Sequence, residues 1–89
     1  MASQDFLPAS DVVARRLGDS AVLIRLTTNR IYELNETGAR VWEMLQGGVS
    51  VDTAIDTLAR EYNAARPVVA NEVEQLLQKL SADGLVVPQ

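Results

Sequence analysis

The chain has 89 residues, of which 47% are hydrophobic and 22% charged, and this suits one compact domain with a single modest core. It contains no cysteine and no histidine, which excludes disulfides, thiolate and imidazole metal ligands, a thiol nucleophile and the commonest general base of enzymes. The formal net charge of −4 argues against sequence-independent binding to nucleic acid and against binding to an anionic membrane, because either would need a basic patch.

The first ten residues are expected to form a flexible segment that precedes a domain spanning residues 11–89. Phe6, Leu7 and Pro8 are the bulky groups of this otherwise small and polar stretch. The stretch lacks the basic and apolar regions of a secretory signal, and no apolar run in the chain approaches the roughly 18 residues that a membrane span requires. We therefore expect a cytoplasmic protein that has no membrane partner.

Three short strands are predicted at the start of the domain. Residues 12–17 and 21–26 are rich in aliphatic side chains, and a Gly-Asp turn separates them. Asn29 can adopt the positive φ of a tight hairpin turn, so residues 30–34 should fold back as a third strand. The result is a three-stranded antiparallel sheet in which the third strand is expected to be an open edge.

Two short helices are predicted after the sheet. Asn35 offers a side-chain oxygen as the N-cap of a helix over about residues 36–46, which a Gly-Gly pair ends. Ser50 can cap a second helix, and its apolar positions form a stripe that continues to about Tyr62.

A third helix should begin near Pro67, which suits a first helical turn, and end at Asp83-Gly84. Its apolar positions recur every three or four residues, and residues 85–87 are apolar enough to pack back on the domain as an extended tail. Three strands followed by three helices make an α+β arrangement. Helices with such tight connections can form a winged helix-turn-helix, with the sheet as the wing.

A winged helix-turn-helix raises the question of DNA binding. The recognition helix of that motif presents basic or amide side chains to phosphates and base edges. Over residues 67–83, however, Glu72, Glu74 and Asp83 stand against the single Lys79, which gives a net charge of −2 and would repel phosphates. A small winged-helix DNA-binding regulator therefore remains only the alternative function.

The carboxylates and the single tryptophan favour structural roles. Glu33 with Glu36, and Asp52 with Asp56, are close enough in sequence to suggest acid–base chemistry or a hard cation. Carboxylates near helix starts are normally stabilised by the helix dipole, however, and neither pair has a third or fourth ligand. Trp42 falls at helical spacing with apolar neighbours and is expected in the core. The sequence thus predicts no catalytic residue, no metal and no cofactor.

The stretch RIYELNETGARVWEML, from Arg30 to Leu45, resembles the PqqD-like family of leader-peptide recognition domains. The similarity continues through the Gly-Gly break and the LAREY end of the second helix to the closing LSADGLV, and covers about residues 12–87. Its Leu-Asn-x-x-Gly-Ala-x-x-Trp core is the most specific part. Within the family, the chain is most similar to the separate recognition proteins of lasso-peptide pathways.

The resemblance implies a non-catalytic module that binds the leader of a ribosomally made precursor peptide and presents the precursor to modifying enzymes. In lasso-peptide pathways these enzymes are a leader peptidase of the cysteine-protease type and a cyclase. The leader would add as a strand to the third predicted strand and place apolar side chains against the third helix. In this binding mode, main-chain hydrogen bonds give affinity and side-chain pockets give specificity.

The contact residues that the resemblance implies lie on the third strand and on the third helix. They are Arg30, Ile31, Tyr32, Glu33 and Leu34 on the strand, and Val69, Glu72, Val73, Leu76, Lys79 and Leu80 on the helix. Some of the aliphatic members must face the core instead of the leader. Successive N–H groups of a strand point to opposite edges, so either Tyr32 or both Ile31 and Glu33 should offer N–H groups to the leader.

Overall fold

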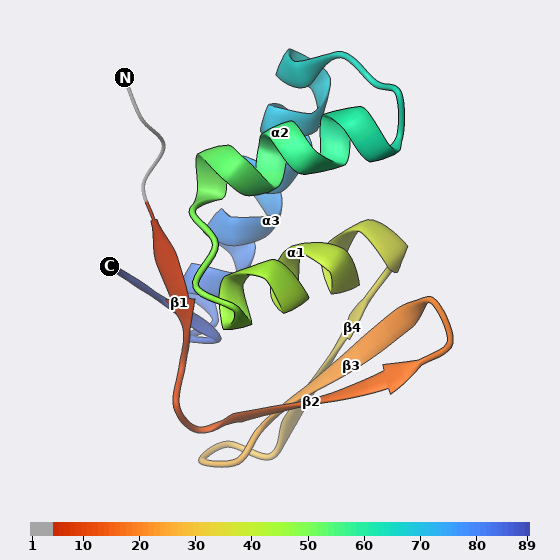
Figure 1. Ribbon diagram of the computed structural model, residues 1–89. Coiled ribbons are helices and arrows are strands. Elements are labelled where there is room, and N and C mark those ends of the chain that lie inside the picture. The colour runs from red at the N-terminus through yellow and green to blue at the C-terminus, as the bar shows by residue number, and fades with distance from the viewer. Residues whose placement is uncertain (1–4) are drawn as a thin grey trace.

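Strands and helices follow one another in a computed structural model that describes residues 5–89, and the three helices lie on one side of a small sheet (Figure 1). The elements are β1 (Phe6–Pro8), β2 (Val12–Leu17), β3 (Ser20–Arg25), β4 (Arg30–Leu34), α1 (Glu36–Gln46), α2 (Val51–Glu61), α3 (Arg66–Ala82) and β5 (Val86–Pro88). Strands β2, β3 and β4 form an antiparallel sheet in that order, and β1 pairs with β5 in a second, two-stranded sheet. The predicted α+β arrangement of three strands and three helices is confirmed.

Local chemistry explains the turns and the starts of the first two helices. Asn29 has a φ of 56° in the turn between β3 and β4, as its side chain predicted. Asn35 Oδ1 accepts a hydrogen bond from the N–H of Gly38 at 2.8 Å, and Ser50 Oγ accepts one from the N–H of Thr53 at 3.2 Å. Both side chains thereby satisfy backbone donors that the first turn of a helix leaves unpaired.

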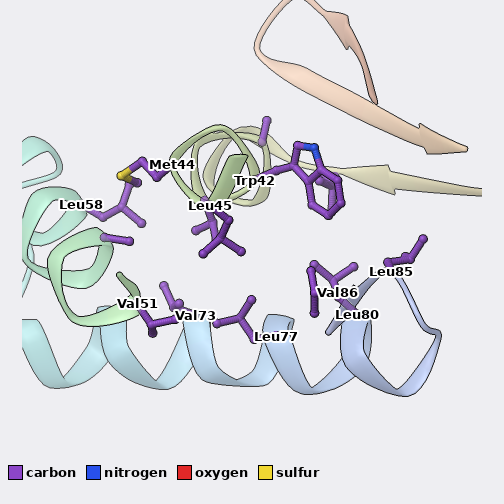
Figure 2. Packing of buried hydrophobic residues seen from close by; sticks show 14 of the residues in the cluster. Trp42, Met44, Leu45, Val51, Leu58, Val73, Leu77, Leu80, Leu85 and Val86 are labelled. Atoms are coloured by element: carbon purple, nitrogen blue, oxygen red, sulfur yellow. The ribbon is translucent and has the colours of Figure 1, made fainter. Parts of the chain in front are cut away.

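The hydrophobic core lies between the inner face of the sheet and the three helices. Leu45 of α1 points toward Leu77 of α3, while Trp42 lies on the side of Leu80 and Val86 (Figure 2). Trp42 is only 2% exposed, so the prediction that it belongs to the core is confirmed. Because each helix buries one apolar stripe here, the opposite helix faces and the outer face of the sheet remain in contact with solvent.

The N-terminal segment is more ordered than the flexible stretch that the sequence suggested. Phe6–Pro8 forms β1 and pairs antiparallel with Val86–Pro88, and Asp5 Oδ1 accepts a hydrogen bond from the N–H of Val51 at 3.0 Å. The physical reason lies in the apolar tail, because Val86 is buried in the core and β5 offers its backbone to a second strand. Residues 1–4, which the same expectation included, lie outside the described residues.

A glycine after α3 makes the contact between the helix end and the sheet possible. Gly84 has a φ of +75°, and a Cβ at this position would lie 2.5 Å from Arg25 Nη1. That nitrogen donates to the carbonyl oxygen of Asp83 at 3.1 Å, while Arg25 Nε lies 3.2 Å from Asp11 Oδ2. Arg25 therefore ties β3 both to the end of α3 and to the start of β2.

Replacing Gly84 with alanine should lower the free energy of unfolding by about 1–3 kcal/mol. Alanine is strained in the left-handed backbone conformation, and its Cβ would displace the side chain of Arg25. Urea denaturation followed by circular dichroism measures this loss. Gly48→Ala is the matched control, since Gly48 has a φ of +81° but open space around the missing Cβ. Equal losses in the two variants would show that the contact with Arg25 contributes no stability.

Candidate functional site

A groove lies between the end of β4, the start of α1 and one side of α3. It consists of two adjoining hollows of about 410 Å³ each. The first hollow is lined from α3 by Glu72, Val73, Gln75, Leu76 and Lys79. The second is lined from the sheet by Ser20, Glu33 and Leu34. Leu76 and Asn35 line both hollows, so Leu76 lies at the centre of the groove.

The side of the groove that α1 forms depends on the Leu-Asn-x-x-Gly sequence at the end of β4. Leu34 is buried, and Asn35 turns the chain into the helix through its cap. A Cβ on Gly38 would lie 3.3 Å from both Asn35 Oδ1 and Leu34 Cβ, so only glycine leaves these contacts undisturbed. This motif therefore brings the start of α1 close against the end of β4.

The predicted helix residues divide between the groove and the core. Glu72, Val73, Leu76 and Lys79 line the groove, whereas the remaining two, Val69 and Leu80, are not among its lining residues. These two are 6% and 3% exposed and pack in the core. The apolar stripe of a helix faces the interior, and Leu76 stands at its margin, where it is only partly buried.

The predicted strand residues divide in a similar way. Glu33 and Leu34 line the groove at one end of β4. Arg30 and Ile31 are exposed along the same strand, and the side chain of Ile31 is 66% exposed. Tyr32 packs partly buried against the core, and its hydroxyl group has no hydrogen-bond partner among the described residues.

The backbone of β4 is open along one edge, because β4 is the last strand of its sheet. The register shows which N–H groups point outward. The N–H of Leu26 donates to the carbonyl oxygen of Asp11 at 2.8 Å, one step beyond the Val12–Arg25 pair of β2 and β3. The N–H of Leu26 therefore points toward β2. Because successive N–H groups alternate between the two edges of a strand, the N–H of Arg25 points toward β4. Every second residue of β3 before Arg25 directs its N–H in the same way.

On β4, the residues opposite these donors are Arg30, Tyr32 and Leu34. Their own N–H groups therefore point toward β3, and those of Ile31 and Glu33 point away from the sheet. The choice that the sequence left open is thus made by the register. The open edge presents backbone donors at Ile31 and Glu33, next to the groove.

The sequence pointed to only part of this site. Gln75 and the residues at the start of α1, namely Asn35, Thr37, Gly38 and Val41, line the groove without having been assigned to it. For Gln75 a signal existed, because positions 72, 75, 76 and 79 share one face of a helix. The residues of α1 carried no such signal, since their place depends on how α1 packs against α3.

The charged side chains of the groove are not engaged in ion pairs. Among residues 5–89, the ion pairs join Arg16 to Glu43, Arg25 to Asp11, Arg40 to Glu43 and Glu61, and Arg66 to Asp52 and Asp56. The lowered pKa of Asp11 arises mainly from a hydrogen bond with Thr27, and that of Glu61 from a hydrogen bond with Arg40. Both carboxyl groups lie outside the groove.

In the part of the chain that the structure describes, no three acidic or cysteine side chains gather closely enough to hold a metal ion. Within residues 5–89, no helix combines the length and the apolar character needed to cross a bilayer.

Comparison with known proteins gives one family and two similar structures. The model of the family described as coenzyme PQQ synthesis protein D matches residues 20–86. The solved structure of TbiB1 in complex with the TbiA(beta) leader peptide is 28% identical, covers 90% of this chain and 93% of that chain, and superposes with a TM-score of 0.86. Lasso peptide synthetase B1 complexed with the leader peptide is 21% identical, with coverages of 94% and 99% and a TM-score of 0.85. No curated protein sequence matches the chain.

Proposed function

This chain belongs to the PqqD family, and from that premise we propose that it is a non-catalytic module that binds the leader segment of a ribosomally made precursor peptide. The observation that carries the proposal is the open edge of β4 beside a groove that has an apolar side chain, Leu76, at its centre. TbiB1, which is 28% identical over most of its length, was solved with a leader peptide bound. The likeness in fold and sequence supports the same class of ligand here.

The leader binds by adding a strand to β4. Its backbone accepts hydrogen bonds from the outward N–H groups of Ile31 and Glu33, and each bond contributes about 0.5–1.5 kcal/mol. Its apolar side chains enter the groove around Leu76 and Val73, where burying one large aliphatic or aromatic side chain contributes about 1.5–3 kcal/mol. Glu72 and Lys79 border this apolar centre.

The finer assignment that we propose is a lasso-peptide pathway. Both similar solved structures carry leader peptides, and one of them is a lasso peptide synthetase B1. In such a pathway the module delivers the bound precursor to a leader peptidase of the cysteine-protease type and to a cyclase. It acts in the cytoplasm, where the ribosomal precursor is made.

No observation favours the alternative function, that of a DNA-binding regulator. Helix α3 begins at Arg66, one residue before the predicted start, and so gains one positive charge. That charge is already engaged, because Arg66 Nε lies 2.5 Å from Asp56 Oδ1 and Nη2 lies 3.4 Å from Asp52 Oδ1. The exposed side of α3 therefore offers no basic row to phosphates.

Fluorescence anisotropy tests the proposal directly. The probes are a labelled synthetic leader of the precursor encoded beside this chain and a labelled duplex DNA from the same region, both titrated at about 0.15 M salt. We expect saturable binding of the leader and no useful affinity for the duplex. Sub-micromolar binding to the DNA that depends on its sequence would overturn the leader-binding function in favour of the regulator.

A further inference from the structure

The sheet has a second open edge, on the side opposite β4. Strand β2 pairs with β3 alone, so its outer backbone edge is free. The N–H of Val12 points outward, since it donates at 3.3 Å to the carbonyl oxygen of Ala9, which precedes the strand. Because successive N–H groups alternate, those of Ala14 and Arg16 point the same way. No hydrogen bond within residues 5–89 engages these two donors, so both are available to an added strand.

A hollow of about 310 Å³ lies beside this edge, between β2 and α1. Residues 14–16 line it from the strand, and Trp42, Glu43 and Gln46 line it from the helix. Cross-strand partners share one face of a sheet, and the partner of Ala14 is the buried Leu23. The small side chain of Ala14 therefore points to the helix side and leaves room in the hollow.

The indole N–H of Trp42 has no hydrogen-bond partner beside this hollow. Trp42 is almost completely buried, and its Nε1 is unpaired among the described residues. Figure 2 shows this nitrogen on the side of the ring that is turned away from α3. Buried donors without a partner are uncommon in folded proteins, so this N–H points to an acceptor oxygen that a ligand brings into the hollow.

An ion pair spans the hollow and controls access to it. Arg16 of β2 pairs with Glu43 of α1, and both side chains line the hollow. These side chains are 44% and 45% exposed, and ion pairs with such exposure contribute little stability. The pair therefore opens readily, and its opening gives an incoming side chain a path to Trp42.

The charges of β2 select the kind of strand that can be added. Arg15 is exposed on the outer face of the sheet, and the ion pairs within residues 5–89 do not include it. Strand β2 carries Arg15 and Arg16 and no acidic residue. Pairing β2 with β2 of a second copy would bring four arginines together, which like-charge repulsion disfavours. An acidic segment, in contrast, is attracted to this edge.

We propose that the β2 edge is a second docking site, which binds an extended acidic segment of a partner protein by strand addition. The residue of this segment opposite Arg15 is acidic and lies on the outer face of the sheet. The next residue, opposite Ala14, places a side-chain oxygen in the hollow, where it accepts a hydrogen bond from Trp42 Nε1. The module thus holds a second polypeptide on the edge of the sheet opposite to the leader.

A short peptide tests the proposal by NMR. The probe is acetyl-Thr-Glu-Gln-Val-Thr-amide, in which Glu and Gln are adjacent as the site requires, and the control probe has Lys in place of Glu. Trp42 is the single tryptophan of the chain, so the isotope-labelled protein gives one indole N–H signal. We expect the Glu probe to move this signal downfield in a saturable manner. The control probe should bind about two- to five-fold more weakly, because one exposed ion pair is lost.

Three variants locate the bound probe. Arg15→Glu should reverse the preference, so that the Lys probe binds more tightly than the Glu probe. Ala14→Pro removes an outward N–H and should weaken both probes, while an edge strand tolerates proline at such a position. Arg60→Glu is the control and should bind both probes like wild type. It reverses an exposed charge of α2 that lines neither the groove nor this hollow. Circular dichroism confirms that each variant is folded.

Three outcomes overturn the second site. These are an indole signal that neither probe moves, an Arg15→Glu variant that keeps the preference of the wild type, and displacement of the probe by the synthetic leader. In the last case the probe occupies β4. The leader alone should leave the indole signal in place. A protein that responds to the Glu probe but does not bind the leader retains this site and loses the proposed function, and the reverse result retains only the function.

Discussion

Replacing Leu76 with aspartate should weaken leader binding by at least ten- to hundred-fold. Leu76 is the apolar side chain that lines both hollows of the groove. Removing its apolar contact with one leader side chain loses about 1.5–3 kcal/mol, and about 1.4 kcal/mol corresponds to a ten-fold change in affinity. A carboxylate in the same place adds a desolvation cost. Isothermal titration calorimetry with the synthetic leader measures the change.

The same helix provides the control for this experiment. Val68→Asp places a carboxylate on an α3 side chain that is 57% exposed and does not line the groove, so it should change the affinity little. Leu76 also packs against the core, and a thermal melt must therefore show that Leu76→Asp is folded. A folded Leu76→Asp variant with wild-type affinity would show that the leader does not bind in this groove.

Proline substitutions along β4 should separate folding from binding. Proline removes a backbone N–H, so its effect depends on the edge to which that N–H points. Tyr32→Pro removes a donor that faces β3 and also the large side chain packed on the core, and should cost about 3–5 kcal/mol of stability. Such a loss is comparable to the whole stability of a small domain.

Ile31→Pro and Glu33→Pro should behave differently from Tyr32→Pro. Their N–H groups point away from the sheet, and an edge strand tolerates proline where its N–H faces solvent. Both variants should stay folded but lose one main-chain bond to the leader, worth about 0.5–1.5 kcal/mol, which raises the dissociation constant two-fold to more than ten-fold. Thermal melts and calorimetry on the three variants provide the comparison.

The outcomes of the proline series distinguish two binding modes. If folded Ile31→Pro and Glu33→Pro both bind the leader like wild type, the leader does not add as a strand to β4. A helix of the leader lying in the groove against Val73 and Leu76 then becomes the better explanation. If Tyr32→Pro is folded while Ile31→Pro is not, the N–H directions that we derived from the register are reversed.

Much of the fold could be predicted because its signals are local. The caps at Asn35 and Ser50 and the turn at Asn29 each depend on one side chain and its nearest backbone, and all three are confirmed. The pairing of β1 with β5 was not predicted. Its two strands have three residues each and lie about eighty residues apart in sequence, so neither shows a period long enough to be recognised.

The site was less accessible to sequence reasoning than the fold. The apolar positions of α3 repeat regularly, but the repeat does not say that Val69 and Leu80 serve the core while Leu76 stands at the margin. Which N–H groups of β4 are free likewise depends on the pairing of β2 with β3, two strands that take no part in the groove. Both properties arise from tertiary packing and register, which a single sequence does not encode locally.

The β1–β5 pair also decides how this domain can be joined to other proteins. The N–H of Gln89 donates to the carbonyl oxygen of Asp5 at 2.9 Å, so the first and last described residues meet, and β1 lies on the side of the molecule away from the start of α1 (Figure 1). A domain with residues 5 and 89 in contact can be inserted into a loop of a host enzyme, because the host chain is interrupted at one point only. Such a chimera would supply a tethered enzyme with its peptide at a high effective concentration.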